Sequence, residues 1–190
     1  MRVLWLIAVG LAIVVGACGS DDEAGAETSA AAVAPCSEVE EIEIANFGDH
    51  NANEFIASDY ETNPPAGGDH NPNALRSGAF YRQPPPLGEA VHLLEHGAVI
   101  GWTNGLERGE RRKVEEALEE LFLEGYYQLA TVENPELKVP FALSAWGALQ
   151  TCDRVDTSVI RPFIERYYAS PKSAESGLAC QGTARGLPPC

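Results

Sequence analysis

The clearest periodic pattern in the chain is an amphipathic stretch between Glu107 and Glu124. Its apolar side chains recur at steps of three and one, which places them on one face of a helix. They are Val114, Ala117, Leu118, Leu121 and Phe122. Gly125 follows directly, where a glycine commonly ends a helix. We therefore predict a helix over residues 107–124 with one face packed on a core.

Two further helices are predicted, one near the end of the chain and one in the middle. Between Ser158 and Ala169 the apolar side chains again share one face, and Pro162 is tolerated because it falls in the first turn. GEAVHLLEHG, residues 88–97, reads as a short helix whose end is set by Gly97.

Short apolar segments rich in β-branched or aromatic residues predict strands at residues 98–103, 126–132 and 139–146. We expect the last two to form a hairpin around ENPELK, and EEIEI at residues 40–44 to form the first strand. Pro and Gly crowd residues 63–88, which predicts an ordered loop with little regular structure.

The predicted order is strand, loop, helix, strand, helix, strand, strand, helix. This order favours an α+β domain in which helices pack on a small mixed sheet beside a long Pro/Gly-rich loop region. A thioredoxin-like arrangement fits the same order and is the alternative, but the sequence has no Cys-x-x-Cys motif for redox chemistry.

The first 17 residues have the pattern of a secretory signal peptide: a cation, an apolar run and then small residues. The apolar run is shorter than the roughly 18 to 20 residues that span a bilayer. Val-Gly-Ala-Cys at its end resembles the box at which bacterial lipoproteins are acylated, so we expect Cys18 to carry a lipid. Residues 18–35 then form an acidic linker, and residues 36–190 a single globular domain. The predicted location is the extracytoplasmic side of the cell envelope, anchored to the membrane by the lipid.

Four cysteines remain: Cys36, Cys152, Cys180 and Cys190. An even number outside the cytoplasm predicts two disulfides, for which three pairings exist. We favour a local bond between Cys180 and Cys190, which leaves Cys36 to pair with Cys152.

The charge balance limits the partners that the chain can have. It has 13 Lys and Arg against 28 Asp and Glu, a formal net charge of −15 at pH 7. Such an excess of acid disfavours nucleic acids as partners. It is compatible with a metal cation, and it predicts no particular protein partner.

All four histidines fall within one quarter of the chain. Gly-Asp-His-Asn occurs twice, around His50 and His70, and VHLLEHG contains His92 and His96. Residues four apart share a helix face, so His92 and His96 can meet at one ion. We expect His70 as the third ligand and His50 as a fourth. Loss of His92 or His96 should weaken binding most, and loss of His50 least.

An oxygen from Glu95 or water would complete the predicted site. Three imidazoles and an oxygen suit zinc or divalent copper. Glu95, Glu89, Asp49 and Asp69 are candidates to orient the ligand imidazoles through their second ring nitrogens.

Two alternatives stay open. His92, Glu95 and His96 also fit the H-x-x-E-H pattern of zinc peptidases, in which Glu95 would be the general base. The histidines can instead be ordinary turn and capping residues of a metal-free module that binds a protein through its Pro-rich loop.

Several of these motifs together resemble a bacterial domain-of-unknown-function family, number 3105. The shared features are His50 ahead of Tyr-x-x-x-Pro-Pro at residues 60–65, Gly-x-His at 68–70, VHLLEHG at 91–97 and Ala-Trp-Gly at 145–147. The resemblance covers about residues 50–168 and includes all four histidines, which favours a shared site. Gly67 and Asp69 stand where the family usually has a serine and a proline, so a serine hydroxyl has no role there.

The resemblance implies an extracytoplasmic, often membrane-anchored domain and brings no established activity. The leading hypothesis is therefore a lipid-anchored, non-enzymatic domain that binds a transition metal through some of its histidines.

Overall fold

The computed structural model describes residues 34–45 and 48–176. The strands are β1 (Glu40–Glu41), β2 (Ala79–Tyr81), β3 (Val99–Thr103), β4 (Leu129–Glu133), β5 (Phe141–Ala145) and β6 (Ala148–Cys152). The helices are α1 (Leu87–Glu95), α2 (Arg108–Leu123) and α3 (Ile160–Tyr167), with short 3-10 helices η1 (Ala57–Asp59) and η2 (Thr157–Val159).

The strands form one mixed sheet in the order β1-β6-β5-β3-β4-β2. β2 and β3 both run parallel to β4, which lies between them, whereas β5 and β6 continue the sheet in antiparallel pairs. The structure thus confirms the α+β class with a small mixed sheet. The β3–α2–β4 unit, followed by the β5–β6 hairpin and α3, is the part compatible with the thioredoxin-like alternative.

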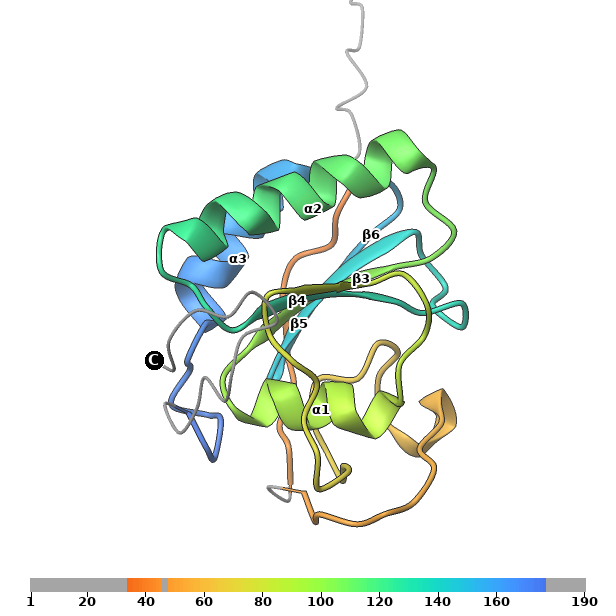
Figure 1. Ribbon diagram of the computed structural model, residues 1–190, viewed down its shortest axis with the longest axis vertical. Helices are drawn as coiled ribbons and strands as arrows, with labels where there is room; N and C mark the ends of the chain where they lie inside the picture. The colour runs from red at the N-terminus through yellow and green to blue at the C-terminus, as the bar shows by residue number, and fades with distance from the viewer. Residues whose placement is uncertain (1–33, 46–47, 177–190) are drawn as a thin grey trace, which may run out of the picture. The chain divides into compact units, whose positions relative to one another are not determined.

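Helices cover both faces of the sheet (Figure 1). α2 and α3 pack on one face over an apolar cluster that includes Leu118, Phe122 and Ile164. α1 packs on the other face, where a second cluster includes Trp102 and Trp146, both fully buried as core residues. α1 is therefore fixed on its apolar side, and the polar loops of the first half of the domain lie near its other side.

The three helices lie where the periodicity predicts them, but the predicted hairpin is wrong. β4 does not pair with β5, because β3 lies between them. α2 connects β3 to β4 by a crossover, the connection that places two strands parallel and adjacent. β5 then takes the free edge of β3. A strand that is buried on both faces shows no periodicity that identifies its neighbour.

Two strands were not predicted. β2 lies within the Pro/Gly-rich stretch, which otherwise has little regular structure, and β6 follows β5 through a tight turn at Trp146 and Gly147, where Gly147 has a φ of 73°. β1 is shorter than predicted, because it pairs with β6 through only Glu40 and Glu41.

Cys36 and Cys152 are joined by a disulfide across a sequence separation of 116 residues. This is the pairing that was favoured for these two cysteines. Cys18, the predicted signal peptide, most of the predicted linker, Cys180 and Cys190 lie outside the described residues. Among residues 34–45 and 48–176, no helix is both long enough and apolar enough to cross a membrane.

Candidate metal centre

The two Gly-Asp-His-Asn repeats lie side by side. His50 and His70 form a parallel bridge, in which the Asn51 N–H donates to the His70 carbonyl (2.9 Å) and the His70 N–H donates to the Asp49 carbonyl (3.1 Å). Side chains at bridged positions of paired strands project to the same side. The two imidazole rings consequently lie 4.5 Å apart between centroids.

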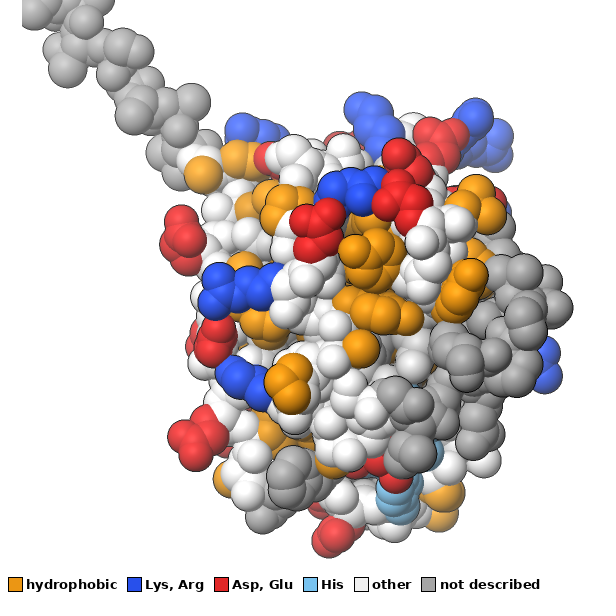
Figure 2. Space-filling view, turned by 90° about the vertical axis from the view of Figure 1, so that its left-hand side faces the viewer, with side chains coloured by type: hydrophobic (Ala, Val, Ile, Leu, Met, Phe, Trp, Pro, Cys, Tyr) orange, Lys and Arg blue, Asp and Glu red, His pale blue; other side chains and the backbone are white. Residues whose placement is uncertain are grey.

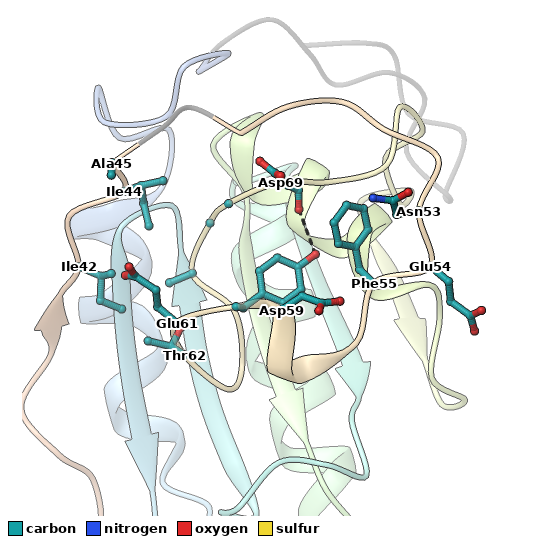
Figure 3. Close-up of a pocket in the computed structure, with 14 residues that line it drawn as sticks. Ile42, Ile44, Ala45, Asn53, Glu54, Phe55, Asp59, Glu61, Thr62 and Asp69 are labelled. Carbon is teal, nitrogen blue, oxygen red and sulfur yellow. Dashed lines mark hydrogen bonds between the residues drawn. The ribbon is translucent and has the colours of Figure 1, made fainter.

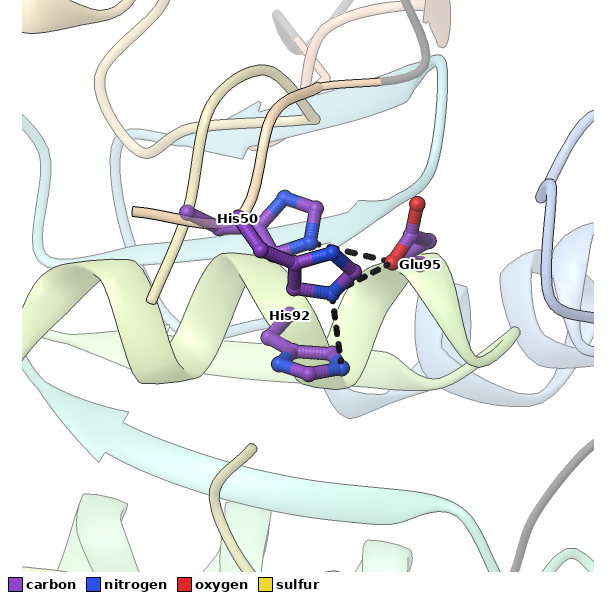
Figure 4. Close-up of side chains that lie close together, drawn as sticks. His50, His92 and Glu95 are labelled. Carbon is purple, nitrogen blue, oxygen red and sulfur yellow. Dashed lines mark hydrogen bonds and ion pairs between the residues drawn. The ribbon is translucent and has the colours of Figure 1, made fainter. Parts of the chain in front are cut away.

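Helix α1 brings the other ligands to the same place. His92 and Glu95 are three residues apart and face the paired loops (Figure 4). The His50 and His92 Nε2 atoms are 3.4 Å apart. The Glu95 Oε2 atom lies 3.0 Å from the His70 Nε2 atom and 3.7 Å from the His50 Nε2 atom. The four ligand atoms of His50, His70, His92 and Glu95 all lie within 4.8 Å of one another, so this group could hold a metal ion.

Backbone carbonyls fix the protonation of two of these rings. The His70 Nδ1 atom lies 2.8 Å from the Gly68 carbonyl oxygen, and the His92 Nδ1 atom lies 2.7 Å from the Asn71 carbonyl oxygen. A carbonyl oxygen can only accept, so each Nδ1 carries the proton and each neutral ring offers a lone pair at Nε2. Metal-ligating histidines are commonly oriented in this way.

The ligand atoms are mostly buried. The side chain of His70 is inaccessible to solvent, whereas that of His50 is 42% exposed. Burial is the main cause that lowers the pKa of His92 to about 4, and the charges of the other three imidazoles lower it further. Burial also raises the pKa of the Glu95 carboxyl. His92 is therefore neutral at physiological pH, which is the form that binds a metal.

Two buried atoms of the group, His70 Nε2 and Glu95 Oε2, are arranged as expected for two ligands of one cation. The His70 Nε2 and Glu95 Oε2 atoms are 3.0 Å apart, yet neither has a hydrogen-bond partner within the part of the chain that the structure describes. An imidazole lone pair and a carboxylate oxygen at this distance repel unless a proton or a cation lies between them. Buried polar atoms without partners are uncommon and call for such an explanation.

His96 belongs to a neighbouring group instead. Its Nε2 atom lies 3.0 Å from the His92 Nε2 atom and 2.9 Å from Glu175 Oε2. His92, His96 and Glu175 form a second set of ligand atoms within 4.8 Å of one another. The sequence favoured His92 with His96, and the second group contains this pair. The sequence placed His50 last, whereas the geometry groups His50 with His70, His92 and Glu95. Glu175 was not predicted, because nothing in the local sequence links it to the histidines.

The acidic residues expected to orient the imidazoles have other contacts. The Asp69 carboxylate accepts the Asp49 N–H (3.0 Å), which reinforces the pairing of the two loops. Glu89 lies in the first turn of α1, where its carbonyl accepts the Leu75 N–H. The orienting acceptors of His70 and His92 are backbone carbonyls, which a sequence pattern does not show.

Two cavities lie near the histidines, and one of them is lined by histidine side chains. One, of about 440 Å³, is lined by His50, His92, His96 and Glu175 among others. Part of the cluster is visible from outside, where pale-blue histidine side chains reach the surface near red carboxylates (Figure 2).

The other cavity, of about 690 Å³, adjoins the loop that carries His70 (Figure 3). Glu54, Asp59, Glu61 and Asp69 surround it, and the Tyr60 hydroxyl donates to the Asp69 carbonyl (3.1 Å) on its wall. These carboxylates give this side of the loop a negative potential, which attracts cations to the region.

Comparison with known proteins gives one match. A family described as "Protein of unknown function (DUF3105)" matches residues 50–182, a segment that contains all four histidines and Glu175. No curated protein and no solved structure matches the chain. Since the matched segment spans well over half of the 190 residues, the chain belongs to the DUF3105 family.

Proposed function

We propose that this protein is a transition-metal-binding domain, held on the extracytoplasmic side of a membrane by a lipid on Cys18, and that it binds rather than hydrolyses. The ion is held by His50, His70, His92 and Glu95. The observation that carries the proposal is that the Nε2 atoms of His70 and His92, whose Nδ1 atoms are engaged by carbonyls, lie within 4.8 Å of each other and of the ligand atoms of Glu95 and His50.

The spacing of the ligand atoms supports a tetrahedral ion. Zinc binds imidazole nitrogen and carboxylate oxygen at about 2.0 to 2.2 Å, so neighbouring ligand atoms around it lie about 3.3 to 3.5 Å apart. Three of the six distances within the group are 3.0, 3.4 and 3.7 Å, and none of the six exceeds 4.8 Å. Three nitrogens and one oxygen suit zinc best, with divalent copper as the second choice.

The same ligand set argues against peptidase chemistry. A catalytic zinc keeps one coordination position for water or substrate, whereas a structural or storage site is closed by four protein ligands. Glu95 supplies the fourth ligand here. In the peptidase interpretation, His92 and His96 would hold the ion and Glu95 would activate water. His92 and His96 do lie together in the group with Glu175, but the Glu95 Oε2 atom faces His70 (3.0 Å) and His50 (3.7 Å) instead of an ion held there.

The location is supported by two features. Val-Gly-Ala-Cys before the acidic linker is a lipoprotein-like acylation site. The disulfide between Cys36 and Cys152 belongs to an oxidising compartment rather than to a reducing cytosol.

Metal analysis of the full chain, purified without an affinity histidine tag, tests the proposal. We expect one ion per chain and tight binding of Zn²⁺ in calorimetric titration. His70→Gln and His92→Gln should each weaken binding by more than the about 10- to 100-fold typical of a group that only orients a ligand. His50→Gln should weaken it clearly, contrary to the order that the sequence favoured. A wild-type chain that binds neither Zn²⁺ nor Cu²⁺ would refute the proposal.

A further inference from the structure

His92 has only one nitrogen to offer to an ion, and two groups of ligands need it. Its Nδ1 atom is engaged by the Asn71 carbonyl (2.7 Å), so Nε2 is the only free ligand atom. This atom belongs both to the group with His50, His70 and Glu95 and to the group with His96 and Glu175. One lone pair binds one ion, so the two positions exclude each other.

The two positions differ in their access to solvent. The inner position has two deeply buried ligands, since the side chains of His70 and Glu95 are 0% and 4% exposed, and one exposed ligand, His50, at 42%. The outer position has Glu175 as a ligand, whose side chain is 34% exposed. His70 and Glu95 are therefore the ligands that an ion from bulk water reaches last.

The 440 Å³ cavity leads to the outer ligands. His50, His92, His96 and Glu175 line it, whereas His70 and Glu95 are not among the described residues that line it. The His96 Nε2 atom lies between the other two outer ligand atoms, at 3.0 Å from His92 and 2.9 Å from Glu175. An ion that arrives through the cavity therefore meets the three outer ligands and His50 before it reaches His70 and Glu95.

We infer that His96 and Glu175 form an outer docking position through which a single metal ion enters and leaves the inner site. The ion passes between the two ligand sets while it stays bound to His92, which belongs to both. This inference rests on the proposed function and adds a transfer route to it. Exchange through a shared ligand lets the ion move without full release into water, because His92 stays bound while the remaining ligands are replaced in turn.

Transfer kinetics test the inference. The full chain loaded with one equivalent of Zn²⁺ is mixed with an excess of a chromophoric chelator, and the rate of zinc transfer is followed by stopped flow. For Glu175→Gln and His96→Gln we expect the transfer rate to fall by at least 10-fold in both directions, while the equilibrium Kd changes by less than about 3-fold. Glu165→Gln is the matched control, because this exposed carboxylate on α3 has the same charge and lies in an ion pair with Arg161. Its transfer rate should equal that of the wild type.

The outcomes separate the inference from the proposal on which it rests. Unchanged transfer rates in the Glu175→Gln variant, with one zinc bound, would overturn the docking position and leave the metal site standing. Two zinc ions per chain, or a loss of affinity in Glu175→Gln as large as in His70→Gln, would also overturn it. Absence of zinc binding by the wild type would overturn both. Circular dichroism of each metal-free variant shows whether a slow rate comes from misfolding, and the exposed Glu175 tolerates the change to Gln better than the buried His96 does.

Discussion

Gly48 turns the chain with a φ of 82°, and a Cβ built on it would collide with the Gly68 carbonyl oxygen. The same Cβ would lie 2.9 Å from the His70 Nδ1 atom. Gly48, the first residue of the first Gly-Asp-His-Asn repeat, thus leaves space for the Gly68 carbonyl, which orients the His70 ring of the second repeat. The repeated glycine serves close packing of the two loops as well as turn formation.

Gly48→Ala should therefore damage both stability and metal binding. A left-handed Ala costs about 1 kcal/mol, and forcing the two loops apart adds about 1 to 3 kcal/mol. Gly105→Ala is the control, because Gly105 has a φ of 62° and nothing lies within 4 Å of its added Cβ. Urea unfolding should show a larger loss for Gly48→Ala, and zinc titration should show weaker binding for that variant only. Equal losses of stability would mean that the collision is relieved without cost.

The candidate ligand residues were predictable, but the backbone groups that orient their side chains were not. Imidazole spacing in VHLLEHG and the repeated motif identified His50, His70, His92 and His96. Asn71 was missed, although its side chain donates to the Asn51 and Asn53 carbonyls (3.2 and 2.8 Å) and its own carbonyl fixes His92. A backbone carbonyl is present at every position, so sequence alone cannot show which one meets an imidazole.

Among the secondary-structure elements, α2 shows how far periodicity carries. The apolar face that predicted the helix is the face that packs against the core. Leu118 on this face is only 1% exposed and lies against the sheet near Gly101. The partners of the strands were less predictable. α2 connects β3 to β4, which lies next to β3 and parallel to it. The apolar sequence of β4 indicates that the strand is buried, but it does not indicate which strands lie beside it.

Leu118→Ala should cost about 3 to 5 kcal/mol of unfolding free energy, because a fully buried leucine leaves a cavity when it is shortened. Leu123→Ala is the matched control on the same helix, since Leu123 is 73% exposed and its loss should stay within about 0.5 kcal/mol. Urea titration followed by circular dichroism measures both. Similar values for the two variants would show that α2 does not pack on the sheet through this face.

Across the whole molecule, the start of the described domain is fastened to its last strand. Besides the disulfide between Cys36 and Cys152, the Ser37 N–H donates to the Thr151 carbonyl (2.8 Å) and the Asp153 N–H donates to the Pro35 carbonyl (2.8 Å). Glu41 then pairs with Lys172 (2.8 Å) beyond α3. These contacts lie along β1 and β6, whereas the proposed metal ligands come from α1 and the loops before it, so stability and metal binding should respond separately to changes here.

Replacing Cys36 and Cys152 together by Ser should lower the free energy of unfolding by about 4 to 5 kcal/mol, the chain-entropy expectation for a loop of roughly 100 residues. The zinc Kd should change by less than about 3-fold, because neither cysteine contacts the ligand groups. Reduction of this double variant then tests the second disulfide. A further fall in the urea midpoint shows that Cys180 and Cys190 are bonded to each other. An unchanged midpoint, together with two alkylatable thiols before reduction, shows that they are not. A double variant as stable as the wild type would mean that the backbone pairing of the N-terminal segment with β6 is sufficient without the covalent bond.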